Sequence, residues 1–222
     1  MFRLVSLNLN GIRSAATKGL VPWAETLSAD CMGVQEIKVH ADDMPEPLRQ
    51  VAGMQGHFHH AQKKGYSGVG FYTRHEPSDV IIGLGASDPS GEFDAEGRYV
   101  EARYDTARRK FSVISCYFPS GSSGEERQAA KYRFLAQMAP HLQRLQARLV
   151  DNIALVDKCG SAASFLATPM WMFTGKQQAR RWLPKAGICE QDIAAASRFG
   201  ERIKQRLQAD NTAITAPMLQ GL

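Results

Sequence analysis

The sequence predicts an α+β fold built as a layered sandwich, and three observations favour this class. Through residue 118, short apolar stretches alternate with turn residues, which is typical of strands. Most of these stretches lie close enough along the chain to pair as antiparallel neighbours. A longer stretch, residues 125–148, repeats its apolar side chains at helical spacing. Strands that come first, with helices at intervals, favour this class over a doubly wound parallel sheet.

The composition indicates a globular protein with a mildly basic surface. Of the 222 residues, 44% are hydrophobic, which is enough for a substantial core. The formal net charge of +5 favours an anionic partner such as nucleic acid. No apolar signal segment opens the chain, and no stretch approaches the length of a membrane span. We therefore expect a cytoplasmic protein without a membrane partner.

The cysteine pattern supports the same compartment. Four cysteines stand far apart, at Cys31, Cys116, Cys159 and Cys189. They form no CxxC pair and no cluster with histidine, which argues against structural zinc and against a disulfide framework. The pattern fits a reducing cytosol.

The first predicted strand begins at Leu4 and ends in two amides, Asn8 and Asn10. Residues two apart on a strand share a face, so the two amides are expected to point together at the strand's end. Gly11 allows a sharp turn there, and Arg13 stands at the mouth of the next element. Amide oxygens can orient a phosphate, a water or a hard cation. The alternative is that the amides only cap the following helix.

The next elements follow in order up to residue 73. Residues 14–27 predict an amphipathic helix, and residues 31–36 predict a short buried strand that delivers Glu36 at its end. Residues 43–54 predict a short helix. Residues 58–62 and 68–73 predict a strand pair joined by a basic loop that exposes Tyr66.

The remaining elements before residue 149 are a strand, a hairpin and a helix. A strand is expected at 80–82, inside a turn-rich stretch. Residues 97–104 and 110–118 predict a hairpin, which places Tyr117 near a strand end. After a Ser/Gly loop, the long helix 125–148 follows.

Several strand ends thus carry polar side chains that can converge. A single glutamate at a strand end, such as Glu36, suits Mg²⁺ because waters and substrate phosphate oxygens complete its ligands. A tyrosine such as Tyr117 can hydrogen-bond a phosphate or take part in proton transfer. Each has a structural alternative: Glu36 as a solvated loop charge, Tyr117 as a rim aromatic, and Tyr66 as an exposed turn residue.

Five motifs occur together over the first two-thirds of the chain. They are SLNLNGIR at 6–13, VQEIKVH at 34–40, GYSGVG at 65–70, EGRY at 96–99 and YFPSG at 117–121. In these motifs and their order, residues 1 to about 148 closely resemble exonuclease III and the abasic-site endonucleases of the endonuclease/exonuclease/phosphatase superfamily. The resemblance implies a DNA-repair nuclease.

The resemblance also implies an architecture, a four-layered α/β sandwich with two packed sheets. Each half of a family member supplies much of one sheet, so residues 1–148 match the N-terminal portion only. Without the second half, the inner face of the first sheet would lack its usual partner. Residues 149–222 resemble no family that we recognise and are expected to be a mainly helical, atypical segment, which a fusion or a frameshift would explain.

Catalytic roles follow from the resemblance. Glu36 would be the main carboxylate for Mg²⁺ (or Mn²⁺), with Asn8 beside it, and Tyr117 would contact the scissile phosphate. The implied reaction is metal-assisted hydrolysis of a phosphodiester 5′ to an abasic site, with trimming of 3′ ends.

DNA-binding roles follow as well. Arg13, Lys38 and Tyr66 would meet the backbone or groove of double-stranded DNA, since lysine and arginine neutralise phosphates. Asn10 would help to hold this surface and the site together.

The second half of the family's site is missing from the sequence. Family members have a strand ending in Gly-Asp-x-Asn and a terminal Ser-Asp-His, whereas the last histidine here is His141. The nearest echo is at 149–154, where Asp151 is a candidate for orienting the attacking water. Because neighbouring strand residues face opposite sides, Asp151 and Asn152 cannot both enter a site without a bulge. The alternative is an ordinary strand-end or turn pair.

These observations leave three hypotheses, and they leave the oligomeric state open. The chain is a metal-dependent DNA-repair nuclease, impaired if its site lacks the second half, or it is a non-catalytic DNA-binding or vestigial family member. The third hypothesis is that the C-terminal segment is an interaction module, because basic residues surround Trp182. The simpler interpretation of the same stretch is a solvated basic helix.

Overall fold

A computed structural model describes residues 2–107, 110–120, 124–145, 200, 201 and 205 of the chain. The chain divides into two compact units, Met1–Ala147 and Arg148–Leu222. The fold described below belongs to the first unit. Asp151 lies outside the described residues, and so does the rest of 149–222 apart from positions 200, 201 and 205, which are helical.

The first sheet has five strands in the order β1-β2-β5-β4-β3. They are β1 (Leu4–Asn8), β2 (Cys31–Gln35), β3 (Gln50–Val51), β4 (Met54–His59) and β5 (Val69–Thr73). β1 and β2 pair in parallel, whereas β2–β5, β5–β4 and β4–β3 are antiparallel. Because β1 and β2 are parallel, their carboxyl ends lie at the same edge of the sheet. Asn8 pairs with Gln35 there and so lies beside Glu36.

The second sheet is antiparallel, with strand order β6-β7-β8. Its strands are β6 (Asp79–Ile82), β7 (Tyr99–Asp105) and β8 (Lys110–Cys116). β7 and β8 pair along their whole length, from Tyr99 with Cys116 to Asp105 with Lys110, which confirms the predicted hairpin.

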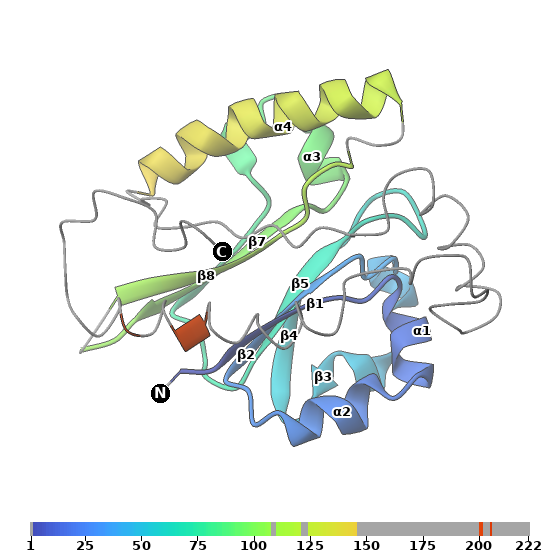
Figure 1. Cartoon of the computed structure of the whole chain (residues 1–222), viewed down its shortest axis with the longest axis vertical. Coiled ribbons are helices and arrows are strands. Elements are labelled where there is room, and N and C mark those ends of the chain that lie inside the picture. Colours follow the sequence, from blue (N-terminus) through green and yellow to red (C-terminus); the bar gives the residue numbers. More distant parts are fainter. Residues whose placement is uncertain (1, 108–109, 121–123, 146–199, 202–204, 206–222) are drawn as a thin grey trace, which may run out of the picture. The chain divides into compact units, whose positions relative to one another are not determined.

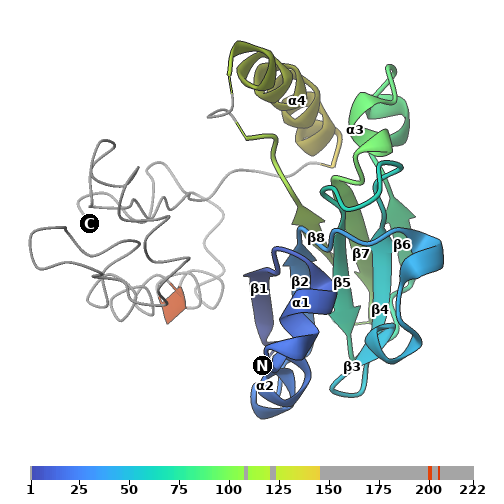
Figure 2. The same cartoon turned by 90° about the vertical axis from the view of Figure 1, so that its right-hand side faces the viewer.

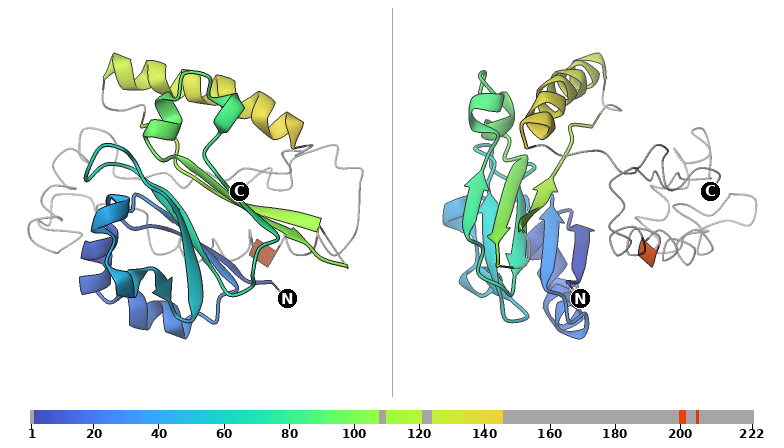
Figure 3. Two further views of the ribbon diagram at one scale, coloured as in Figure 1. Left: turned by 180° about the vertical axis from the view of Figure 1, so that it is seen from behind. Right: turned by 90° about the vertical axis from the view of Figure 1, so that its left-hand side faces the viewer.

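Helices cover the outer faces of the two sheets, which gives four layers (Figures 1 and 2). The α-helices are α1 (Ile12–Thr17), α2 (Leu20–Thr26), α3 (Glu92–Ala95) and α4 (Glu125–Arg144), with 3₁₀ turns at Ala41–Asp43, Glu46–Leu48 and Gly85–Ser87. α1 and α2 share a core with the five-stranded sheet, and α3 and α4 share one with the three-stranded sheet. Seen from behind in Figure 3, the strands again lie between these two sets of helices. The layered architecture implied by the sequence is therefore confirmed.

The inner face of the five-stranded sheet is covered by strands from the same half of the chain. Cys31, Val69 and Phe71 pack with Val100 and Ala102 of β7 in one buried cluster. The expectation that this face lacks a partner was wrong for β2 and β5, because β7 and β8 of the second sheet cover them, whereas Leu4, Ser6 and Asn8 of β1 stay exposed. No helix in the described part of the chain is long and apolar enough to cross a membrane.

Two predicted helices differ from the structure. Residues 14–27 form two short helices, because Gly19 adopts a left-handed conformation with φ +94° and separates α1 from α2. Residues 43–54 form 3₁₀ turns and strand instead of a helix. Pro45 and Pro47 limit helical hydrogen bonding there, and Ala52 and Gly53, both with positive φ, make the turn between β3 and β4.

Gly97 is a position where the fold requires glycine, and replacing it predicts a large loss of stability. Its φ is +63°, and an added Cβ would lie 2.6 Å from the carbonyl oxygen of His59 and 2.7 Å from the backbone nitrogen of Ala61. We expect Gly97→Ala to lower the free energy of unfolding by about 2–4 kcal/mol. Gly91→Ala is the matched control, because Gly91 has φ +68° with open space around it. Urea denaturation of both variants measures the difference, and equal losses would contradict the predicted clash.

Candidate active site

The candidate site centres on Glu36, which follows the end of β2. Its backbone has φ +52° and is fixed by hydrogen bonds on both sides, from Gly11 N–H to the Glu36 carbonyl and from Ile37 N–H to the Gly68 carbonyl. The carboxylate receives three side-chain donors from three different elements. Asn8 Nδ2 donates to Oε1 at 2.8 Å, the Tyr117 hydroxyl donates to the same oxygen at 2.7 Å, and Lys38 Nζ lies 2.7 Å from Oε2. The Glu36 side chain is 17% exposed, so its carboxylate is partly accessible from outside the protein.

The orientation of the Asn8 amide is set by its neighbours. Asn10 N–H donates to Asn8 Oδ1 at 3.0 Å, which only an oxygen can accept. The nitrogen of the amide therefore faces Glu36. The alternative that the amides only cap the following helix was wrong, because the N-cap of α1 is Gly11 and no side chain caps that helix.

Lys38 lies between two oxygens of the site. Its ammonium donates to Asn10 Oδ1 at 2.5 Å and pairs with Glu36 Oε2. Asn10 and Lys38 both have positive φ, of +46° and +48°, and Lys38 N–H is held by the Ser67 carbonyl at 2.9 Å. These turns aim the lysine back at the carboxylate, so that an amide oxygen and a carboxylate oxygen surround one cation.

The hydrogen bonds set the charge of both ionisable groups at the centre. Burial alone would raise the pKa of Glu36, but hydrogen bonds from Lys38, Asn8 and Tyr117 outweigh it and hold that pKa below its usual value. Burial, and then the bond to Glu36, raises the pKa of Tyr117 to about 12. At neutral pH the site therefore holds a carboxylate beside a protonated phenol donor.

The lowered pKa of Glu36 predicts a specific dependence of stability on pH. The ionised carboxylate contributes stability above the unfolded value of 4.5, and this contribution is lost as the pH falls through the lower folded pKa. Glu36→Gln lacks this titration. We expect the difference in unfolding free energy, wild type minus Glu36→Gln, to be constant above about pH 5.5 and to fall below it. Urea titrations across this range measure it. A difference that rises on acidification would indicate a raised pKa.

A second polar cluster surrounds Tyr66 and contains Glu96, Arg98 and Arg127, which were not predicted as site residues. The Tyr66 hydroxyl donates to Glu96 Oε1 at 3.2 Å and accepts from Arg98 Nη2 at 3.1 Å and from Arg127 Nη2. Glu96 and Arg98 belong to the EGRY motif, which was therefore the sequence signal that could have identified them. Nothing in the helical pattern of α4 marks Arg127.

Of the predicted DNA-binding residues, Arg13 is exposed on α1 and takes part in none of the hydrogen bonds given above for the two clusters. Tyr66 and Tyr117 are joined through Arg98, whose guanidinium carbon lies 5.9 Å and 5.2 Å from the centres of their rings. Of the eight predicted residues, Asp151 lies outside the described ones. The structure brings together six of the other seven, all except Arg13.

The donor set fits a hard cation. Among the described residues, no three side chains of His, Cys, Asp or Glu are grouped to bind a metal. One carboxylate is nevertheless sufficient for Mg²⁺ when waters and phosphate oxygens complete its shell. The oxygens of Glu36 and Asn10 already surround a cation, the ammonium of Lys38, which shows that the position suits positive charge.

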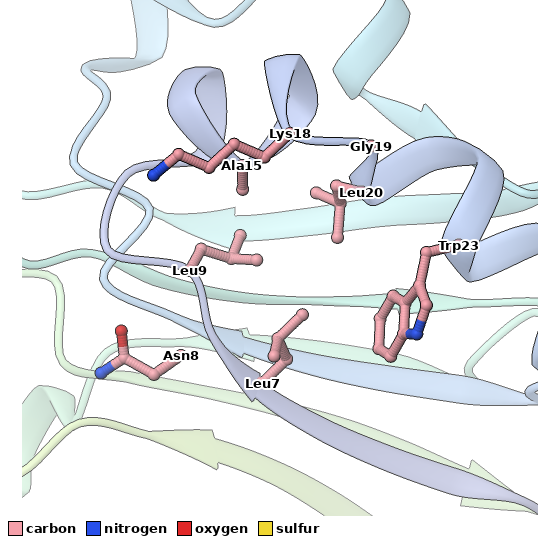
Figure 4. Close-up of a pocket in the computed structure, with 8 residues that line it drawn as sticks. All are labelled: Leu7, Asn8, Leu9, Ala15, Lys18, Gly19, Leu20 and Trp23. Atoms are coloured by element: carbon pink, nitrogen blue, oxygen red, sulfur yellow. The ribbon is translucent and has the colours of Figure 1, made fainter. Parts of the chain in front are cut away.

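A shallow pocket of about 350 Å³ lies behind this site, between β1 and the helices α1 and α2 (Figure 4). Leu7 and Leu9 line it together with Leu20 and Trp23, and no acidic residue does. The Asn8 side chain is directed away from this apolar lining (Figure 4). Asn8 also lines the pocket and donates to Glu36, so the pocket borders the site, with a mainly apolar lining.

Comparisons with known proteins agree with the geometry. A sequence model described as the Endonuclease/Exonuclease/phosphatase family matches residues 5–157. Exodeoxyribonuclease III of Haemophilus influenzae is 33% identical over 189 residues, which cover 84% of this chain and 66% of that protein. Both matches extend past residue 148, so the likeness reaches into the segment that sequence reasoning left unrecognised.

Solved structures show the same fold. An AP endonuclease from Archaeoglobus fulgidus has a TM-score of 0.52 and 29% identity, over 65% of this chain and 52% of that one. The catalytic domain of Xenopus laevis APE2 has a TM-score of 0.54 and 26% identity, over 69% and 62%. The chain thus spans between about half and two-thirds of the length of these relatives.

Proposed function

This chain belongs to the endonuclease/exonuclease/phosphatase family, and from that membership we propose that it is a DNA-repair nuclease. Its reaction is metal-dependent hydrolysis of DNA phosphodiesters, 5′ to abasic sites and at 3′ ends. The observation that carries the proposal is the single carboxylate of Glu36, held by Asn8, Lys38 and Tyr117 from separate elements. Relatives named exodeoxyribonuclease III and AP endonuclease support this substrate class.

Glu36 is the residue that would hold the divalent ion, Mg²⁺ or Mn²⁺, with the amides of Asn8 and Asn10 at its side. Such an ion supplies charge stabilisation to the phosphoryl group and the leaving oxygen. Asn8 holds the carboxylate in place through its nitrogen. The Tyr117 hydroxyl, protonated at neutral pH, can donate a hydrogen bond to a phosphate oxygen, which stabilises developing negative charge.

We propose that double-stranded DNA binds across the same edge of the molecule. Arg13 is exposed on α1, and Lys38 and Tyr66 lie on neighbouring loops. Lysine and arginine neutralise phosphates, so binding of this kind weakens as salt increases. We also propose that the protein works in the cytoplasm, where a reducing medium suits the free thiols of Cys31 and Cys116.

The domain division is part of the proposal. Residues 1–148 form the N-terminal portion of the nuclease domain, and residues 149–222 form a separate segment in which Asp151 is the candidate for orienting water. The alternative function is that of a non-catalytic DNA-binding or vestigial family member. The sequence feature that favours this alternative is the lack of histidine after His141.

Cleavage of a 5′-labelled duplex that carries one abasic site tests the proposal. In Mg²⁺ we expect a cut immediately 5′ to the lesion, with a 3′-hydroxyl that a polymerase can extend. The same duplex without the lesion is the control for random nicking. Tight binding of the abasic duplex without any cut would support the non-catalytic alternative and overturn the enzymatic one.

A further inference from the structure

Arg98 has a position unlike that of the other charged residues of the site. It lies directly before β7, and its side chain is 1% exposed. A buried guanidinium is costly unless its nitrogens find partners. Each of the three nitrogens of Arg98 donates to a different partner. Nε donates to Glu96 Oε2, Nη1 donates to the Tyr117 carbonyl at 2.8 Å, and Nη2 donates to the Tyr66 hydroxyl at 3.1 Å.

The contacts of Arg98 reach both tyrosines of the site. Besides the side-chain bond to its carbonyl, Tyr117 donates its backbone N–H to the Arg98 carbonyl at 3.0 Å. The guanidinium also lies near both aromatic rings. Tyr117 in turn donates its hydroxyl to Glu36. One buried side chain therefore links the loop of Tyr66 to the residue that contacts the carboxylate.

The Tyr66 hydroxyl has no capacity left for a further strong partner. A phenol has one hydrogen to donate and two lone pairs to accept with. Glu96 takes the hydrogen, and Arg98 and Arg127 occupy the lone pairs. Tyr66 must therefore contact any ligand through its ring, and the direction of that ring depends on the two arginines.

We propose that Arg98 is the positioning residue of this site, and that it fixes the rings of Tyr66 and Tyr117 relative to each other and to Glu36. Arg127, from the first turn of α4, donates to Tyr66 and to Glu96, and of the two tyrosines it assists at Tyr66 only. The planar fork of arginine is required, because a lysine ammonium cannot reach three separated acceptors in fixed directions. For its effect on DNA binding, the inference rests on the function proposed above.

Tyrosine NMR tests the positioning without DNA or metal. In protein labelled with ¹³C at the tyrosine ring, the signals of Tyr66 and Tyr117 are assigned with single Tyr→Phe variants. We expect Arg98→Lys to shift both signals and Arg127→Met to shift that of Tyr66 alone. Arg98→Lys with both signals unmoved would overturn the proposal, and so would Arg127→Met moving both equally. If Arg98→Lys does not fold, Glu96→Gln replaces it, because it removes the charge that holds Arg98 and is expected to move both signals.

Fluorescence anisotropy in EDTA then measures the affinity for a duplex with a tetrahydrofuran abasic analogue. Because lysine keeps the positive charge, Arg98→Lys tests geometry and not charge. We expect about tenfold weaker binding, the size of one lost charge-assisted hydrogen bond. Unchanged affinity, with both NMR signals shifted, would overturn the role in DNA binding. If the wild type itself does not bind, the proposed function fails, while the NMR result still decides the positioning.

Discussion

Glu36→Gln is expected to lower the rate of incision at an abasic site at least about 1,000-fold, because it removes the only carboxylate of the described site while keeping its shape. The amide still accepts hydrogen bonds from Asn8 and Tyr117. It cannot attract a divalent ion, and it leaves the ammonium of Lys38 without its anionic partner. Single-turnover rates at saturating DNA measure the effect on the chemical step.

A matched control separates this effect from a general loss of charge. Glu25→Gln makes the same substitution on the exposed face of α2, where we expect an unchanged rate. DNA affinity in EDTA should not weaken in Glu36→Gln, because removing a negative charge beside a phosphate site reduces repulsion. A Glu36→Gln rate within tenfold of wild type would contradict the role assigned to Glu36.

Tyr117→Phe is expected to lower the incision rate about 100-fold, the usual effect of removing one donor from a site where charge develops. The ring and its contact with Arg98 remain, whereas the hydroxyl that donates to Glu36 is lost. That hydrogen bond is one of three that lower the pKa of Glu36, so this pKa should rise in the variant. The acidic limb of the pH–rate profile is then expected to move to higher pH.

Tyr132→Phe is the control for this variant. Tyr132 is 63% exposed on α4, and we expect its loss of hydroxyl to change neither the rate nor the pH profile. A Tyr117→Phe enzyme with a reduced rate but an unmoved acidic limb would show that the hydroxyl acts on the substrate alone. An unchanged rate would contradict any catalytic role for Tyr117.

The sequence was most informative where residue spacing determines geometry. Asn8 is the last residue of β1 and Glu36 follows β2, and the parallel pairing of these strands brings the two side chains into contact. That pairing was not predicted, since the strands were expected mainly as antiparallel neighbours. The positive φ values of Glu36 and Lys38 could not be predicted either, because among residue types it is mainly glycine and asparagine that indicate a left-handed conformation.

The missed features depend on contacts between residues far apart in the chain. Arg127 reaches Tyr66 across 61 positions, and helical periodicity says nothing about such a contact. The covering of the first sheet by β7 and β8 likewise depends on which faces meet. Local breakers explain the other errors: Gly19 divides one predicted helix, and Pro45 and Pro47 prevent another.

The most direct test of the account is cleavage of an abasic duplex by the full chain in Mg²⁺ and in EDTA. Glu36→Ala protein, purified in parallel, controls for a contaminating host nuclease. The account predicts cleavage by the wild type in Mg²⁺, no cleavage in EDTA, and none by Glu36→Ala in either. Equal residual cleavage by both preparations would contradict the account and leave a chain that at most binds DNA.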